Sequence, residues 1–161
     1  MSYSHSVLFV CLGNICRSPA GAALLNARIQ KDPQLQDRVM GDSCGLGSWY
    51  VGHTPDQRMQ RQAQACGVSL TGRARQFTSS CFSDYDLILP VDRSIQYSLY
   101  ERAKSPQEKS KIHLATEFSG SFPKEDIPDP FFESDAAFDL ALDMLEDVCD
   151  GLIHFMRQKW A

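Results

Sequence analysis

Short apolar runs alternate along the chain with longer segments in which apolar residues recur every three or four positions. The first run, residues 7–10, is continuous and is bounded by turn residues, as in a strand that is buried on both faces. Similar runs at 85–91 (YDLILPV) and 111–118 (KIHLATEF) predict two more strands. The stretch RVMGDSCG near residue 40 is a weaker candidate for another.

The amphipathic segments between these runs predict helices. Ser18 and Pro19 supply an N-cap and a first helical residue for a helix that reaches about residue 30. A second helix follows Thr54-Pro55-Asp56 and stops at Gly67, and a third runs from Asp92 to about residue 104. A long last helix opens at Ser134, with one apolar face made of Phe138, Leu142, Leu145, Cys149, Leu152 and Met156.

Regular alternation of strand and helix predicts the α/β class, with a four-stranded parallel sheet and helices on both of its faces. Ligands of such sheets bind beyond the carboxyl ends of the strands. The residues that follow each strand are therefore the first place to look for chemistry.

The composition of the chain limits its domain number, its partners and its compartment, but it does not indicate a function. A chain of 161 residues with 43% hydrophobic and 22% charged residues suits one globular domain, residues 1–161. The net charge of −4 gives no reason to expect binding to nucleic acid or to a membrane. No apolar run reaches the ~20 residues that span a bilayer, and the N-terminal segment does not resemble a signal peptide, so we expect a cytoplasmic protein.

The cysteines and histidines do not form a metal-binding pattern. Six cysteines in a cytoplasmic protein are expected to be reduced thiols. There is no CxxC pair, and the four histidines are scattered, so we expect neither a metal nor a cofactor.

The segment CLGNICRS, which joins the first strand to the first helix, has the features of an anion-binding loop. Backbone N–H groups at a helix N-terminus bind anions, and Gly13 and Asn14 tolerate the left-handed backbone that a tight curl needs. Arg17 can grip a tetrahedral oxyanion with two parallel hydrogen bonds. Cys11 at the base of this loop would be favoured as a thiolate facing bound phosphate, a nucleophile in position. The alternative is a buried cysteine at the end of a strand with an unrelated surface arginine.

A phosphate ester also needs a proton for its leaving group. Asp129 in IPDPFF is the best candidate, because prolines on both sides restrict its backbone and its loop follows the predicted fourth strand. A Pro-Asp-Pro turn that merely leads into a helix is the competing interpretation.

These motifs together resemble the low-molecular-weight protein tyrosine phosphatases. The stretches VLFVCLGNICRSP, DSCGLGSWYVGHTPDQR, RARQF and YDLILPVDRS, followed by a late DP and aromatics, match that family in order and spacing over nearly the whole chain. The resemblance implies hydrolysis of aryl phosphates on tyrosine-phosphorylated proteins, with inorganic phosphate as product and inhibitor. It assigns Cys11 as nucleophile, Arg17 as phosphate clamp and Asp129 as general acid.

The same resemblance gives supporting roles to further residues. Ser18 would hydrogen-bond the thiolate and help it to leave phosphorus, and Asn14 would support the loop with Ser43 as partner. Asp92 is placed to orient Arg17, although its role as a helix cap is an equal alternative. The family often has a histidine before ARQ that joins this network, and here Gly72 lies near that place. Pro90 also departs from the family pattern.

The same loop and its neighbours predict the substrate pocket. Leu12 and Ile15, with Trp49 and Tyr50 from the next loop and Phe131 beyond the late DP, would form a deep apolar slot that suits a phenyl ring. Phosphoserine is too short to bring its phosphorus to the bottom of such a slot. Trp49 as part of the core is the alternative.

Two other functions and one regulatory feature stay open. An arsenate reductase of the same fold needs two further cysteines close together, and Cys81 has no near cysteine in the sequence; a phosphotyrosine-binding module would usually have lost Cys11 or Asp129. Cys16 is either packing below the loop or a thiol that forms a reversible disulfide with Cys11 after oxidation.

Overall fold

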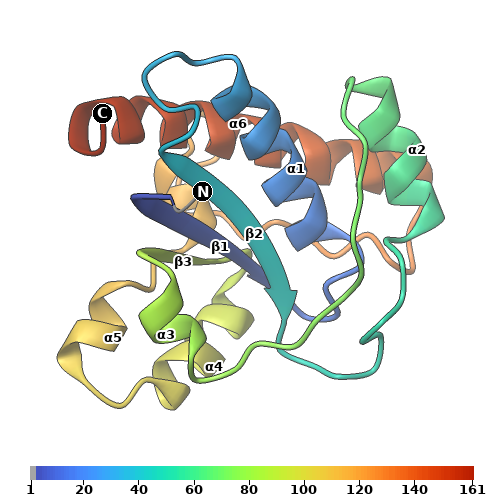
Figure 1. The fold of residues 1–161 in the computed structure, drawn as a ribbon. Helices are drawn as coiled ribbons and strands as arrows, with labels where there is room; N and C mark the ends of the chain where they lie inside the picture. The colour runs from blue at the N-terminus through green and yellow to red at the C-terminus, as the bar shows by residue number, and fades with distance from the viewer. Residues whose placement is uncertain (1–2) are drawn as a thin grey trace.

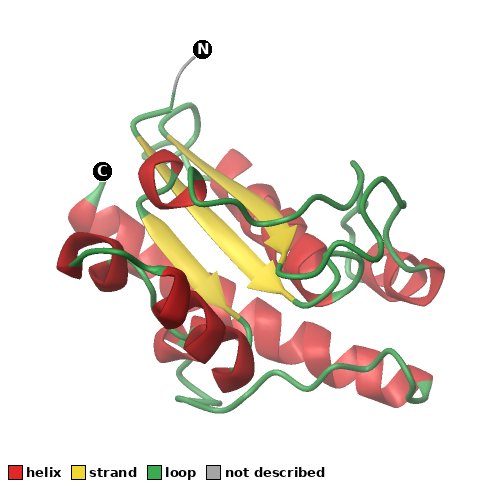
Figure 2. Ribbon diagram, turned by 90° about the horizontal axis from the view of Figure 1, so that it is seen from below, coloured by secondary structure: helices red, strands yellow, loops and turns green. Residues whose placement is uncertain are grey.

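A computed structural model describes residues 3–161 of the chain. At its centre lies a parallel sheet of three strands, β1 (His5–Cys11), β2 (Val39–Gly45) and β3 (Leu87–Pro90), in the order β2-β1-β3. All three strand arrows point the same way in Figure 2. The predicted α/β class and the weak strand candidate near residue 40 are confirmed.

Six α-helices and one short 3-10 helix surround the sheet in the described part of the chain (Figure 1). They are α1 (Arg17–Gln30), α2 (Gln57–Ala65), α3 (Cys81–Asp84), α4 (Arg93–Arg102), α5 (Pro106–Ser110), η1 (Ala115–Phe118) and α6 (Asp135–Lys159). Helices α1, α2, α4 and α6 correspond to the four that the apolar spacing predicts. The short α3 and α5 were not predicted.

The alternation of side chains along β1 creates an apolar layer on each face of the sheet. Val7 and Phe9 pack with residues of α1 and α6, whereas Leu8 and Val10 pack with residues of α3 and α4. Gly21 lets α1 lie close to the strand, because a Cβ there would be 2.8 Å from the ring of Phe9. Helices therefore cover both faces of the sheet, as predicted.

The prediction of a fourth strand at 111–118 is wrong. Only Ile112 pairs with β3, through a single bridge to Ile88, and the chain then enters η1. The backbone N–H of Ile88 donates to the carbonyl of Lys111, and its carbonyl accepts from the N–H of His113. Because alternate residues of a strand face the same neighbour, the next residue of β3 that would donate to this segment is Pro90. Proline has no N–H, and the pairing cannot continue.

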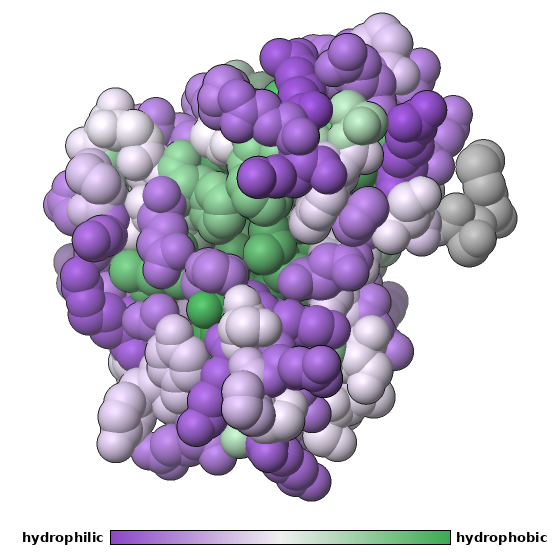
Figure 3. All heavy atoms as spheres, turned by 90° about the vertical axis from the view of Figure 1, so that its left-hand side faces the viewer, coloured by the Kyte–Doolittle hydropathy of each residue, from purple (hydrophilic) through white to green (hydrophobic). Residues whose placement is uncertain are grey.

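The two ends of the sheet lead to different kinds of surface. The carboxyl ends of the strands lead into the segment 12–16, the segment after β2 and Val91-Asp92. The opposite side of the molecule, which faces the viewer in Figure 3, has a hollow of apolar atoms surrounded by polar ones. Trp160 stacks on His5, at the start of β1, and packs edge-on against Phe155.

No helix in residues 3–161 is long and apolar enough to cross a membrane.

Candidate active site at the carboxyl end of the sheet

The loop between β1 and α1 curls around the sulfur of Cys11. Asn14 has a φ of 59°, in the left-handed region, and its backbone N–H donates to the Cys11 sulfur over 3.3 Å. The helix begins at Arg17 with Cys16 at its N-cap, so the prediction that Ser18 caps the helix is wrong. The Ser18 hydroxyl lies instead 2.9 Å from the Cys11 sulfur.

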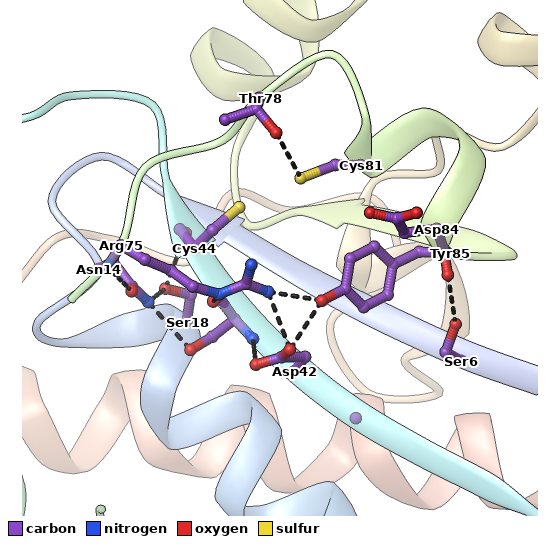
Figure 4. Close-up of polar contacts among 12 residues, drawn as sticks. Ser6, Asn14, Ser18, Asp42, Cys44, Arg75, Thr78, Cys81, Asp84 and Tyr85 are labelled. Carbon is purple, nitrogen blue, oxygen red and sulfur yellow. Dashed lines mark hydrogen bonds and ion pairs between the residues drawn. The ribbon is translucent and has the colours of Figure 1, made fainter. Parts of the chain in front are cut away.

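The side-chain amide of Asn14 holds this curl through hydrogen bonds to neighbouring segments (Figure 4). Its nitrogen donates to the hydroxyl of Ser18 at 2.8 Å and to that of Ser43 at 2.9 Å. Its oxygen accepts from the backbone N–H of Arg75 at 2.8 Å. The structure thus brings the predicted pair Asn14 and Ser43 together, and a main-chain group completes the network.

Arg17 is buried beside the loop and is held from two sides. Its Nη1 donates to Asp92 and to the carbonyl of Ile127, both at 2.8 Å. The other oxygen of Asp92 accepts from the N–H of Ile95 and caps α4. Asp92 therefore makes both contacts that the sequence offered as alternatives, one with Arg17 and one with the helix N-terminus. Burial alone would lower the pKa of Arg17, but the neighbouring Cys11 and Asp92 raise it, and the guanidinium stays charged.

Asp129 lies at the mouth of the site, on the long segment between η1 and α6. One carboxylate oxygen is 3.6 Å from Nη2 of Arg17, and the other accepts from the backbone N–H of Phe131 at 3.1 Å. The side chain is 44% exposed. It is therefore open to solvent while it stays beside the buried guanidinium.

Above the loop opens a cavity of about 400 Å³. It is lined by Cys11, Leu12, Gly13, Ile15, Cys16, Arg17, Trp49, Tyr50, Asp129, Phe131 and Phe132. All five residues predicted to form the slot are among them, and Phe132 joins Phe131 in the wall. Trp49 is 68% exposed, which excludes the alternative that it belongs to the core.

Comparison with known proteins decides the family. The model of the low molecular weight phosphotyrosine protein phosphatases matches residues 6–161. The chain belongs to this family. The resemblance drawn from the sequence is therefore confirmed, and the protein is a hydrolase.

Individual relatives agree over almost the full length. A low molecular weight protein-tyrosine-phosphatase of Streptomyces coelicolor is 33% identical over 97% of this chain and 96% of its own. A crystal structure of a protein tyrosine phosphatase from Entamoeba histolytica matches with a TM-score of 0.90 and 33% identity, covering 96% of this chain and 98% of that one. An arginine phosphatase of Drosophila matches with a TM-score of 0.86 and 32% identity, covering 95% and 98%.

Arg58 of this phosphatase contacts the mouth of the site although no sequence motif pointed to it. Its Nη2 donates to the carbonyl of Phe131 at 2.8 Å, and Asp56 binds the same guanidinium. The guanidinium also lies 5.5 Å from the ring centre of Phe131 and 4.7 Å from that of Phe138. Arg58 thus fixes the segment that carries Asp129 to α2 and α6.

The other buried cysteines of the phosphatase divide between the two faces of the sheet. Cys16 lines the same cavity as Cys11, and burial, reinforced by Cys11, raises the pKa of its thiol. Cys81 lies beside Cys44, whose contact lowers the pKa of Cys81 to about 6 (Figure 4). Sequence spacing could not show this pair. The pair Cys44 and Cys81 packs with Leu8 and Val10, on the face of the sheet opposite to that of Cys11.

Proposed function

We propose that the protein hydrolyses phosphotyrosine through a phosphocysteine intermediate on Cys11. The observation that carries the proposal is that one cavity is lined by the Cys11 sulfur, the Arg17 guanidinium and the Asp129 carboxyl group. A nucleophile, a clamp for a dianion and a proton donor thereby face the same bound phosphate.

In the first step the Cys11 thiolate attacks phosphorus and the bond to the tyrosine oxygen breaks. Arg17 and the N–H groups of the loop bind the phosphoryl oxygens. Asp129, in its protonated form, gives its proton to the departing phenolate. The products are free tyrosine on the protein substrate and phosphocysteine.

In the second step water attacks phosphorus and the bond to sulfur breaks. The Asp129 carboxylate takes a proton from the water, and the electron pair of the broken bond returns to Cys11. The Ser18 hydroxyl, 2.9 Å from that sulfur, donates a hydrogen bond to the thiolate as it leaves. Inorganic phosphate is released, and it inhibits by occupying the same loop.

The walls of the cavity favour an aromatic ester. Tyr50 and Phe131 lie with ring centres 5.9 Å apart, and Leu12 and Ile15 add aliphatic surface to the same cavity. A phenyl ring fills such a slot and positions its phosphate on Cys11, whereas a phosphoserine side chain is too short. Phosphoarginine is a second candidate substrate, favoured by the likeness to the Drosophila arginine phosphatase.

Arsenate reduction is the less favoured function. A relay would need two more cysteines in reach of Cys11, but the adjacent pair Cys44 and Cys81 lies across the sheet from it. A non-catalytic binding module is disfavoured because Cys11 and Asp129 both line the cavity. Thioredoxin-dependent arsenate reduction and turnover of para-nitrophenyl phosphate separate these alternatives.

Reversible oxidation is a regulatory addition to this activity. Cys11 and Cys16 line one cavity, and six free thiols suit the reducing cytoplasm in which we place the protein. Hydrogen peroxide would convert the Cys11 thiolate to a sulfenic acid, and attack by the Cys16 sulfur would release water and form a Cys11–Cys16 disulfide.

The first test of the function is the turnover of para-nitrophenyl phosphate and of a phosphotyrosine peptide by the parent, Cys11→Ser and Cys66→Ser. Cys66 is exposed and lies outside the cavity, so Cys66→Ser should keep full activity. Cys11→Ser should lose all turnover but still bind the peptide. Activity in Cys11→Ser would refute the proposed nucleophile. A parent that hydrolyses phosphoarginine faster than phosphotyrosine would reverse the choice of substrate.

The proton donor has its own test in the variant Asp129→Asn. We expect kcat to fall by roughly 10²–10⁴. The two esters para-nitrophenyl phosphate and phenyl phosphate are compared by kcat/KM, which reports only the first step, and kcat/KM should fall more for phenyl phosphate. The reason is that a more basic leaving oxygen depends more on protonation. A loss of equal size for both esters would show that Asp129 only shapes its loop.

A further inference from the structure

Three side chains behind the phosphate-binding loop contact one another (Figure 4). They are Asp42 of β2, Arg75 of the segment between α2 and α3, and Tyr85 just before β3. Nη2 of Arg75 donates to Asp42 at 2.8 Å and to the Tyr85 hydroxyl at 2.5 Å, and that hydroxyl donates to Asp42 at 2.7 Å. We call these residues the Asp42–Arg75–Tyr85 cluster.

The cluster fixes the main chain at Arg75. Nε of the same guanidinium donates to the carbonyl of Ser43 at 3.1 Å, so the side chain contacts β2 at two consecutive residues. The carbonyl of Arg75 also accepts from the N–H of Gly45 at 2.9 Å. Burial, together with the carboxylate of Asp42, raises the pKa of Tyr85, so this hydroxyl remains a donor.

The fixed N–H of Arg75 determines which way the Asn14 amide points. A backbone N–H can only donate, so the oxygen of the amide must face it and the NH₂ group must face Ser18 and Ser43. Because Ser18 accepts from this NH₂ group, its own proton is left for the Cys11 sulfur at 2.9 Å or for the carbonyl of Cys44 at 3.2 Å.

The family often has a histidine before ARQ that joins the Asn14 network, but this chain has Gly72 near that place and so has no side chain there. Gly72 has a φ of 83°, and a Cβ built on it would meet no atom within 4 Å. The link between Asn14 and the outer part of the molecule therefore runs through Arg75.

We infer that the Asp42–Arg75–Tyr85 cluster is a positioning unit which, through Asn14, directs the Ser18 hydroxyl at Cys11 and so accelerates the hydrolysis of phosphocysteine. This inference rests on the proposed function. None of the three side chains lines the cavity, so none should contact the substrate. The effect belongs to the second step because the Cys11 sulfur, as it leaves phosphorus, needs the hydrogen bond from Ser18. If the Asn14 amide turned over, Ser18 would donate to Asn14 and not to Cys11.

The variant Tyr85→Phe tests this with the loss of one oxygen. We expect kcat for para-nitrophenyl phosphate to fall by roughly 3- to 10-fold, because only part of the loss of the hydrogen bonds to Asp42 and Arg75 reaches Ser18. KM should fall in parallel, because only the second step slows, and rapid mixing should reveal a larger burst of nitrophenolate. Tyr97→Phe, at an exposed position on α4, is the matched control and should behave as the parent. Asp42→Asn should shift kcat and KM in the same direction.

A double-mutant cycle with Ser18→Ala separates positioning from general support of the fold. If the cluster acts through Ser18, Tyr85→Phe should cause no further loss in the Ser18→Ala background. Additive losses would overturn the inference. An unchanged kcat in both Tyr85→Phe and Asp42→Asn would also overturn it. The inference would fail too if the variants lost kcat/KM together with a lower Tm, because that would indicate a general loss of folded enzyme. A parent that hydrolyses no aryl phosphate would instead refute the proposed function itself.

Discussion

At the residue scale, the two cysteines at the ends of the segment between β1 and α1 have different environments. The Cys11 sulfur accepts from the Asn14 N–H and lies beside the Ser18 hydroxyl. Cys16 is the N-cap residue of α1, is buried, and has a pKa raised by that burial. At neutral pH Cys16 is therefore a thiol, and its role in phosphate chemistry is that of packing. Peroxide should oxidise Cys11 first.

The prediction for this pair is that hydrogen peroxide inactivates the enzyme reversibly, and that Cys16→Ser makes the inactivation resistant to dithiothreitol. Without Cys16, the sulfenic acid of Cys11 has no resolving thiol in the cavity and oxidises further. Inorganic phosphate should protect, because it covers Cys11. Activity after reduction and mass spectrometry of the linked peptide are the measurements, with Cys66→Ser as control. Full recovery of Cys16→Ser, or the absence of a linked peptide in the parent, would leave Cys16 a packing residue.

Sequence reasoning at this scale located side chains that line the cavity and, through the family resemblance, several that support them, but it missed Arg58 and Arg75. Cys11 and Arg17 share a short motif with a turn before a helix, and such a motif has a direct physical meaning. Arg58 and Arg75 act through long side chains that reach across elements. No spacing in the sequence reports such a contact, since it depends on tertiary packing.

At the element scale, the apolar pattern predicts the strands of the sheet and the long helices, and it fails for the short helices. Helix α6 repeats its apolar face over 25 residues, and all six residues predicted to face the core are buried. Helices α3 and α5 have four and five residues, which is too short for a period to appear. The segment 111–118 has the apolar content of a strand, but Pro90 on its neighbour removes the donor that pairing requires.

Contact between α6 and η1 gives a prediction for Gly151. A helical Gly→Ala change ordinarily stabilises by about 0.5–1 kcal/mol. Here the added Cβ would lie 1.7 Å from the carbonyl oxygen of Phe118, so α6 and η1 would have to separate. We expect Gly151→Ala to lower stability by about 1–3 kcal/mol, measured by urea unfolding. Gly120→Ala, where a Cβ would meet no atom within 4 Å, is the control, and equal stability of the two variants would contradict the prediction.

At the scale of the whole molecule, the parallel sheet explains why residues far apart in the sequence meet at one cavity. Strands β1 and β3 both end at the edge where Arg17 binds Asp92, and Ile127 donates its backbone N–H to Val91 at that same edge. This contact brings the segment that carries Asp129 over the loop. Topology rules therefore predicted the meeting of these segments, even though the segment before Asp129 follows a single bridge and η1 in place of a fourth strand.

An ion pair between the end of α1 and the end of α6 links the two longest helices. Nε of Arg157 donates to Asp32 at 2.6 Å, and Asp32 is only 4% exposed. Burial alone would raise the pKa of Asp32, but Arg157 and the backbone N–H of Gln34 outweigh it and hold this pKa below its usual range. The charged pair therefore stabilises the fold above the ordinary aspartate pKa of about 3.9, and this stabilisation disappears as pH falls through the lowered pKa.

We therefore expect Arg157→Ala to lower the free energy of unfolding clearly at about pH 7, and the difference from the parent to shrink toward about pH 3. The reason is that Asp32 without Arg157 is a buried carboxylate at neutral pH whose charge only backbone N–H groups stabilise, and protonation at acid pH removes that charge. Urea unfolding across this range is the measurement, and Arg61→Ala, at an exposed position of α2, is the control for loss of a surface arginine. Phosphatase activity at neutral pH should persist wherever the variant is folded, because neither residue lines the cavity. A difference in stability that stays the same from neutral to acid pH would show that Arg157 contributes by packing of its side chain and not by its charge.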